Sequence, residues 1–180
     1  KKSESERLAA YIGHTDADVW VMQKGVSNMH MASSLIPTWK LDSVARVPGV
    51  AGVTPILYLN SLVYAGHRKW LSYVVGLQDG AERGGPWEME RGSSTVRTGE
   101  AVIPALMATL SGVDLGSKIQ IADRSFIVAG LSRGTFSMAN PVTFVHADDL
   151  QEILSTSGYH SYLLVKAQAG VQPQALAEAI

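Results

Sequence analysis

Short apolar runs alternate with turn residues along this chain, a pattern that favours several strands and a few short helices. Residues 17–22 (ADVWVM) are apolar on both faces and rich in Val and Trp, so they predict a central strand covered on both sides. Residues 56–64 and 70–77 are two β-rich runs joined by a polar turn at 66–68, which is typical of a hairpin.

A second hairpin is predicted where residues 117–121 and 124–131 alternate in polarity across a tight turn. Further short strands are expected at 101–103, 142–145 and 159–166. Between the two hairpins, residues 79–100 are rich in Gly and charge. We expect an irregular connection there, of the kind that forms a functional loop or a junction between subdomains.

Helix signals are short and scattered. Ser3 with Glu6, and Asp148 with Gln151, have the spacing of capping boxes. Pro104 and Pro173 each suit a first helical position. The expected helices cover 3–11, 41–47, 104–110, 148–156 and 174–180.

The order of these elements does not alternate regularly between strand and helix. A doubly wound parallel sheet requires that alternation. The sequence therefore predicts an α+β fold with two sub-regions.

Charge and composition narrow the function. Fifteen Lys and Arg against sixteen Asp and Glu give a net charge of -1 with no block of one sign, which argues against a nucleic-acid partner. The absence of cysteine excludes disulfides, Cys-ligated metals and a thiol nucleophile. The longest apolar stretch, 47–65, is interrupted by Pro and polar residues and is not a membrane span. The first residues lack both Met and a signal-peptide apolar region, so we interpret the chain as a segment of a longer protein.

A serine motif suggests hydrolase chemistry. Ser132 is the centre of a G-x-S-x-G string, and Asp148, Asp149 and His160 follow in the chain order of an α/β-hydrolase triad. The nucleophile elbow requires a helix directly behind the serine, and residues 134–141 have no helical periodicity. The competing interpretation, a hairpin strand that ends in a glycine turn, is favoured.

Two strings could hold metals. His14, Asp16 and Asp18 offer imidazole and carboxylate ligands to a divalent ion, or serve as solvated and capping residues at a helix–strand junction. Met29-His30-Met31, with Met22 nearby, offers the soft ligands of Cu(I), but packing or a partner-facing patch is the favoured interpretation. We therefore assign no metal site.

Two further features bear on recognition. Residues 112–118 resemble a phosphate loop with only three residues between the glycines instead of four, so no nucleotide site or cofactor is expected. Trp39, Trp70, Trp87 and the 79–100 loop are better candidates for contact with a ligand or partner, with burial as the alternative for each Trp, above all Trp70.

Four segments together resemble the extracytoplasmic domain of MacB/FtsX-type ABC transporter permeases, nearest the DevC-like branch. They are ADVWVMQKG at 17–25, VPGVAGVTP at 47–55, GEAVIPALMATLSGVDLGSKIQIADRSFIVAGLSRG at 99–134 and VTFVHADDL at 142–150. Each string is a strand or turn pattern, and the specificity lies in their order and spacing.

This resemblance implies a porter-like α+β subdomain formed by residues 1–98 and 140–180, and a mostly β inserted subdomain at 99–139. It implies a place between the first and second transmembrane helices of a permease, on the periplasmic face of the bacterial inner membrane. It implies no catalytic, cofactor or metal residues, because the ATPase is a separate cytoplasmic subunit or domain. The implied partners are that ATPase, a periplasmic adaptor protein and a second permease copy.

Three function classes follow. The first is a domain that couples cytoplasmic ATP hydrolysis to export or handover of a substrate outside the membrane. The second is a ligand-binding or adaptor-docking module of a membrane receptor. The third is a serine hydrolase that uses Ser132, which a Ser132→Ala variant would inactivate.

Overall fold

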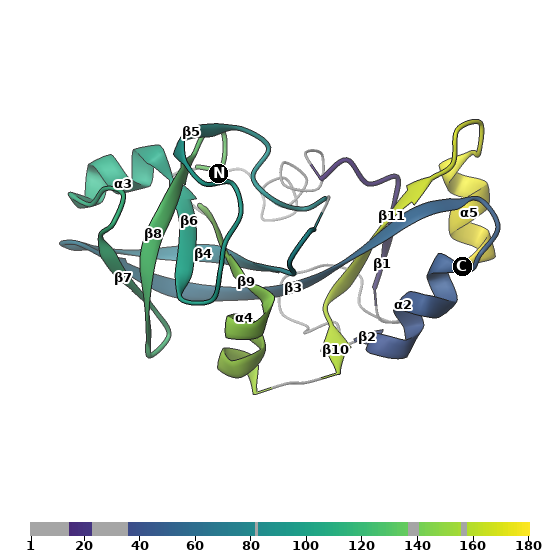
Figure 1. The fold of residues 1–180 in the computed structure, drawn as a ribbon, viewed down its shortest axis with the longest axis horizontal. Coiled ribbons are helices and arrows are strands. Elements are labelled where there is room, and N and C mark those ends of the chain that lie inside the picture. The colour runs from purple at the N-terminus through teal and green to yellow at the C-terminus, as the bar shows by residue number, and fades with distance from the viewer. Residues whose placement is uncertain (1–14, 23–35, 82, 137–140, 156–157) are drawn as a thin grey trace. The chain divides into compact units, whose positions relative to one another are not determined.

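The computed structural model describes residues 15–22, 36–81, 83–136, 141–155 and 158–180 (Figure 1). The chain forms two compact units. Unit 1 comprises Lys1–Ile56, Ala81–Gly84 and Ser157–Ile180, and unit 2 comprises Leu57–Gly80 and Gly85–Thr156. The helix expected at 3–11 and the Met29-His30-Met31 string lie outside the described residues.

Unit 1 is built on an antiparallel sheet. β1 (Val19–Val21) pairs with β11 (Tyr162–Ala167), and β11 pairs with residues 50–56 of β3 (Val50–Ala65). A separate short ribbon pairs β2 (Ile36–Pro37) with β10 (Tyr159–His160). The prediction of a strand at 17–22 is confirmed by β1. The expectation that this strand is central is wrong, because within the described residues β1 pairs with β11 alone and forms the edge of the sheet.

Two helices complete unit 1 (Figure 1): α2 (Thr38–Ala45) and α5 (Pro173–Ala179). α5 has Pro at its first turn, as predicted, since the fixed φ of Pro suits that position and its missing N–H costs nothing there. Both helices contribute to one apolar core, which consists of Val19, Ile36, Val44, Val50, Leu163, Val165 and Leu176.

Unit 2 contains a closed ring of six strands. The remainder of β3 pairs with β4 (Arg68–Leu77), and the ring continues through the strands β9 (Val142–His146), β6 (Glu100–Pro104), β8 (Arg124–Ser132) and β7 (Lys118–Ile121). β7 pairs with β3 as well as β8, and this second pairing closes the ring. Both predicted hairpins, β3–β4 and β7–β8, are confirmed.

The interior of unit 2 is filled by strand side chains and by two helices. Phe126 and Val128 of β8 are buried with Met107 of α3 (Ala105–Ser111) and Leu150 of α4 (Ala147–Leu154) in one core. A Cβ on Gly66, before β4, would meet the Ser111 carbonyl, and one on Gly76, near the end of β4, would meet Leu150. The two helices therefore pack at opposite ends of β4.

Two expectations about helix ends have different outcomes. α3 ends at Gly112 with a left-handed φ of 77°, as predicted. Pro104 was expected at the first helical position but is the last residue of β6 and the N-cap of α3, with extended backbone. The capping box of Asp148 with Gln151 is wrong. α4 begins one residue earlier, and the Nδ1 atom of His146 accepts a hydrogen bond from the Asp148 N–H at 3.1 Å. An imidazole acceptor here replaces the carboxylate that the sequence pattern suggested.

The 79–100 segment is not irregular throughout. β5 (Met89–Gly92) lies within it and pairs antiparallel with β8. The strand was missed because it has no apolar run and its side chains are mostly exposed, so it is held by backbone hydrogen bonds to its neighbour. The strand expected at 159–166 is likewise divided, into β10 and β11.

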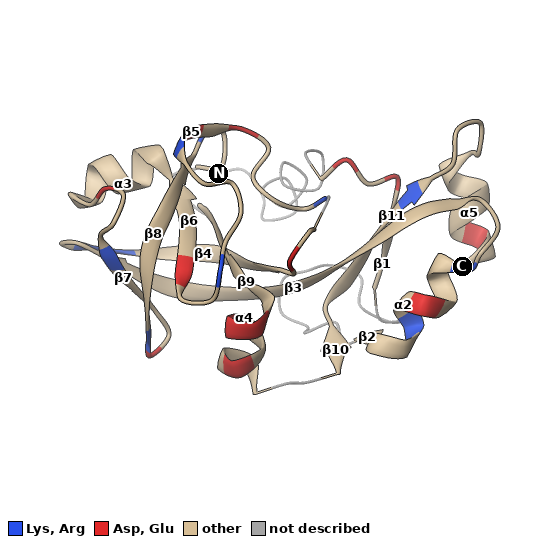
Figure 2. Cartoon of the chain, in the orientation of Figure 1, with Lys and Arg blue, Asp and Glu red and all other residues tan. Residues whose placement is uncertain are grey.

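The architecture is α+β, as predicted from the sequence. Residues 99–139 fall within unit 2, which also takes residues 57–80, 85–98 and 140–156. The inserted subdomain at 99–139 stays a prediction. Figure 2 shows basic and acidic residues interspersed over the described chain, in agreement with the near-zero net charge. Within the described residues, no helix is long and apolar enough to cross a membrane.

Candidate ligand pocket

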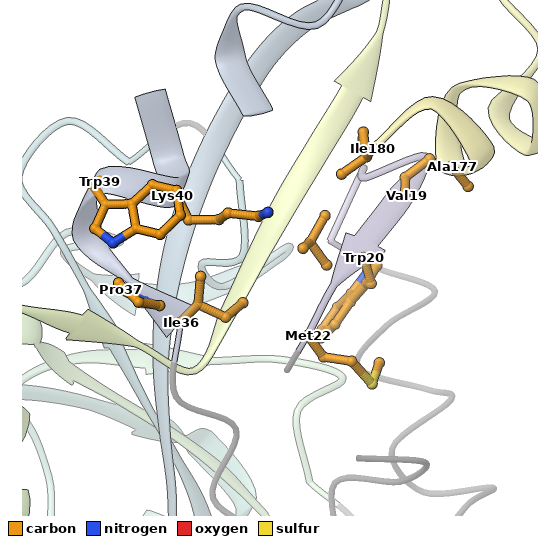
Figure 3. A pocket seen from close by; sticks show the side chains of 10 residues that line it. Val19, Trp20, Met22, Ile36, Pro37, Trp39, Lys40, Ala177 and Ile180 are labelled. Atoms are coloured by element: carbon orange, nitrogen blue, oxygen red, sulfur yellow. The ribbon is translucent and has the colours of Figure 1, made fainter. Parts of the chain in front are cut away.

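A pocket of about 590 Å³ lies within unit 1, where three segments distant in sequence meet. β1 supplies one wall, the end of β2 and the first turn of α2 supply another, and the end of the chain at α5 supplies the third (Figure 3). The volume is in the range of about 300–1,000 Å³ that small-molecule pockets occupy.

The pocket lining is apolar with one exception. Nine of its ten residues are aliphatic, aromatic, Met or Pro, and the tenth is Lys40. Trp39, which is 64% exposed, and Trp20 bring the largest apolar surfaces. Such a lining offers contact area to a nonpolar group and few positions for hydrogen bonds.

Lys40 gives the pocket its charge. Its side chain extends from α2 across the pocket, as Figure 3 shows, and its Nζ atom lies 5.7 Å from the centroid of the Trp39 ring. In the described part of the chain, no carboxylate pairs with this ammonium and none lines the pocket. The aromatic face stabilises the cation without neutralising it.

Two buried titratable groups lie on the strands beside the pocket. His160 is paired in register with Ile36, and burial lowers the pKa of His160 below its usual 6.5. Tyr162 packs against Trp20 with ring centroids 5.5 Å apart, and burial raises the pKa of Tyr162 to about 12. Both shifts favour the neutral form, so these groups leave Lys40 as the charge of the site.

The predicted hydrolase residues do not form a nucleophile elbow. Ser132 is buried at the end of β8, and its Oγ atom hydrogen-bonds the Thr135 hydroxyl. Residues 133–136 contain a bend and do not form the helix that an elbow requires. Asp149 instead accepts a hydrogen bond from the Gly99 N–H at 2.8 Å and pairs with Arg124 at 3.7 Å.

The other triad candidates have local roles. Asp148 is exposed at the start of α4, with its carboxylate 3.7 Å from His146 Nδ1. His160 is buried in β10, which belongs to unit 1, whereas Ser132 belongs to unit 2. The interpretation of this motif as a strand that ends in a glycine turn agrees with the structure.

The two carboxylates of the H-x-D-x-D string make hydrogen bonds and ion pairs with other residues of the protein. Asp16 accepts from the Lys166 ammonium at 3.1 Å and lies 3.9 Å from Arg83 Nε. Asp18 accepts from the Ala167 N–H at 2.8 Å. Asp16 has a left-handed φ of 56°, so the segment is not the extended strand that would align these side chains. His14 lies outside the described residues, among which no cluster suitable for a metal is found.

The three tryptophans proposed for recognition have different fates. Trp39 is exposed at the pocket. Trp70 is half-buried and donates a hydrogen bond from Nε1 to the Ser111 hydroxyl at 2.8 Å. Trp87 lies so close to Gly134 that a Cβ there would be 2.9 Å from the indole nitrogen. The phosphate-loop-like string at 112–118 is the connection from α3 to β7.

Sequence reasoning missed Lys40 and the contribution of α5. Neither has a local signal, because the pocket forms only when β1, α2 and α5 pack together in unit 1. Met22, considered as a copper ligand, is one of the lining residues. Trp39 is the pocket residue that the sequence analysis proposed for contact with a ligand or partner.

The fold and the sequence together define the class of this protein. The sequence profile of the MacB-like periplasmic core domain matches residues 3–180, nearly the whole chain. The chain therefore belongs to this family and is an extracytoplasmic domain of an ABC transporter permease, as the sequence resemblance predicted. Domains of this kind are generally non-catalytic.

Two solved structures have a similar fold. The extracellular domain of the noncanonic ABC-type transporter YknZ from Gram-positive bacteria has a TM-score of 0.65 and 12% identity, over 87% of this chain and 86% of that one. The periplasmic region of MacB from Actinobacillus actinomycetemcomitans has a TM-score of 0.64 and 12% identity, over 93% and 84%. No curated protein matches the sequence.

Proposed function

We propose that this domain couples ATP hydrolysis in the cytoplasm to export or handover of a substrate outside the membrane. The family match over residues 3–180 carries the proposal, because it makes the chain part of an ABC transporter, which works with an ATPase partner. Domains of this family are generally non-catalytic, so we propose that the contribution of this domain is mechanical.

The packing of unit 1 supports a mechanical role. α5 packs on β1 through the apolar core, so a displacement of α5 would be transmitted to the sheet. We propose that α5 and the helix that the sequence predicts at 3–11 connect to transmembrane helices and act as levers. The sheet is the body that they move.

Cross-linking tests this mechanism in the full-length permease with its ATPase. The domain has no cysteine, so a Val19→Cys/Ala177→Cys pair provides its only thiols. The two positions line the same pocket, and Figure 3 shows them beside each other. A short bis-maleimide reagent should fix α5 to β1. We expect ATP hydrolysis to continue while transport falls at least tenfold.

The matched control is a Leu62→Cys/Leu71→Cys pair within unit 2. These residues are exposed and lie directly opposite each other on β3 and β4, so a cross-link there joins strands already held by the ring. Transport should be unchanged. If complete cross-linking of the α5–β1 pair also leaves transport unchanged, the lever mechanism is wrong.

The remaining features of the assembly are part of the proposal. We place the domain on the periplasmic face of the bacterial inner membrane, with a second permease copy and a periplasmic adaptor protein as partners. We also propose that residues 99–139 are an insertion into a porter-like subdomain of residues 1–98 and 140–180. Co-purification of tagged and untagged permease copies would test the dimer.

A further inference from the structure

We propose that the unit 1 pocket binds a single-chain amphiphile with an anionic head group. The apolar walls would hold the chain, and the Lys40 ammonium would pair with the head group. This inference concerns binding by the domain itself. It goes beyond the coupling function and does not depend on it.

The distribution of charge selects the class of ligand. A purely apolar ligand would cover the partly exposed Lys40 ammonium and give it no counterion, which is unfavourable. A cationic amphiphile would be repelled by the same ammonium. An anionic amphiphile can contact the apolar walls with its chain and pair its head group with Lys40. No acidic side chain among the described residues competes for Lys40.

The position of Lys40 supports the same conclusion. It lies in the first turn of α2, and Figure 3 shows its ammonium between Trp39 on one side and the β1 wall on the other. A head group paired there would leave the chain to extend along Trp20, Val21 and Ile180. The volume of about 590 Å³ is sufficient for one chain and is too small for a folded protein segment.

Tryptophan quenching by 12-bromododecanoate tests this proposal on the 180-residue chain. Trp20 and Trp39 line the pocket, whereas Trp70 and Trp87 belong to unit 2. Bound bromine quenches nearby indoles, so we expect saturable quenching below the micelle concentration of the probe. Trp39→Phe should reduce its amplitude, and Trp70→Phe should not.

Charge variants separate an anion site from a general apolar site. Lys40→Met should weaken binding of the probe about tenfold, because it removes the paired cation and keeps the apolar stem. Lys69→Met changes the net charge equally at an exposed position of unit 2 and should have no effect. Equal affinities for both variants would overturn the proposal.

Competition identifies the head group. Dodecanoate should displace the probe, decanoate should be about tenfold weaker because it has two methylenes fewer, and dodecyltrimethylammonium should not compete. Dodecyl phosphate distinguishes a phospholipid-like from a fatty-acid-like head group, and displacement by either anion supports the site. Non-saturable quenching, or equal competition by the cationic amphiphile, would exclude it.

Discussion

In unit 2 every strand of the six-membered ring has hydrogen-bonded neighbours on both sides, whereas in unit 1 β1 pairs with β11 alone within the described residues. The ring also surrounds its core, while the sheet of unit 1 depends on α2 and α5 to cover its apolar residues. A closed arrangement resists local opening better than an open one. We therefore expect local opening to need less free energy in unit 1, which contains the pocket, than in unit 2.

Core truncations provide the largest test of this contrast. Phe126→Ala should cost about 3–5 kcal/mol, because Phe126 is fully buried inside the ring and the ring cannot collapse around the cavity. Leu176→Ala, on α5, should cost about 2–4 kcal/mol.

Hydrogen exchange separates the two effects. Leu176→Ala should raise exchange of the β1 and β11 amides and leave the ring amides protected. Phe126→Ala should raise exchange throughout unit 2. If both variants unfold the whole chain in one transition, the units are not independent and the contrast fails.

A glycine substitution tests how tightly α3 is packed in unit 2. Gly66 has a φ of 54°, and a Cβ there would lie 2.0 Å from the Ser111 carbonyl oxygen. We expect Gly66→Ala to lower the free energy of unfolding by about 2–4 kcal/mol, measured by urea denaturation. Gly116→Ala has a similar φ of 85° and open space around it, so it should cost only about 1 kcal/mol. Equal losses would show that backbone strain alone decides the effect.

The Asp149–Arg124 pair tests a buried charge in unit 2. Arg124→Met removes the cation beside the buried Asp149 carboxylate, which keeps its hydrogen bond from the Gly99 N–H, so we expect a loss of about 2 kcal/mol in the free energy of unfolding. Arg91→Met breaks the exposed pair with Asp114 and should cost less than about 1 kcal/mol. A loss for Arg91→Met as large as that for Arg124→Met would contradict this view of burial.

An alkaline titration should affect unit 1 through Tyr162. The pKa of this phenol is about 12 in the folded state and 10.0 when unperturbed. The contribution of the neutral phenol to the free energy of unfolding is therefore complete below pH 10. Stability should then fall as the pH rises from 10 to about 12, because the unfolded state releases its proton first. Tyr162→Phe should remove this part of the decline in urea midpoint, and Tyr159→Phe, at an exposed position, should not.

An acid titration should act on the same unit through His160, with the smallest effect. Because burial lowers the pKa of His160 in the folded state, its neutral form is favoured there. The contribution is complete above pH 6.5 and is lost as the pH falls through the lower folded pKa. His160→Gln should reduce the loss of stability at acid pH, measured as the urea midpoint. If the same loss persists in His160→Gln, other groups cause it.

Local signals explain which parts of the fold could be predicted. Pro104 and Gly112 mark the ends of α3 by backbone chemistry, and alternating polarity identified both hairpins. β5 carries no such signal because its stabilisation comes from backbone pairing with β8. The closure of the ring by β7 against β3 could not be anticipated either, since that pairing joins residues more than 50 positions apart.

The pocket was less predictable than the fold. Trp39 stood out as a large aromatic group near a helix start, but Lys40 is an ordinary surface residue in the sequence. Lys40 becomes part of a site because β1 and α5 line the same pocket. The sequence could not show this, since β1 and α5 are far apart along the chain. The serine motif shows that a local signal can also mislead. Ser132 lies in a string with the spacing of a catalytic motif, but its hydroxyl makes a local hydrogen bond with Thr135.

The interrupted course of the chain has a consequence for biosynthesis. All residues of unit 2 have been synthesised once Thr156 has been added, whereas unit 1 needs β11 and α5, which are made last. As the chain emerges outside the membrane, the ring can fold while β1 still lacks its partner. The emerging chain therefore exposes the apolar residues of β1 until residue 167 has crossed the membrane, and during this interval a chaperone has most to protect.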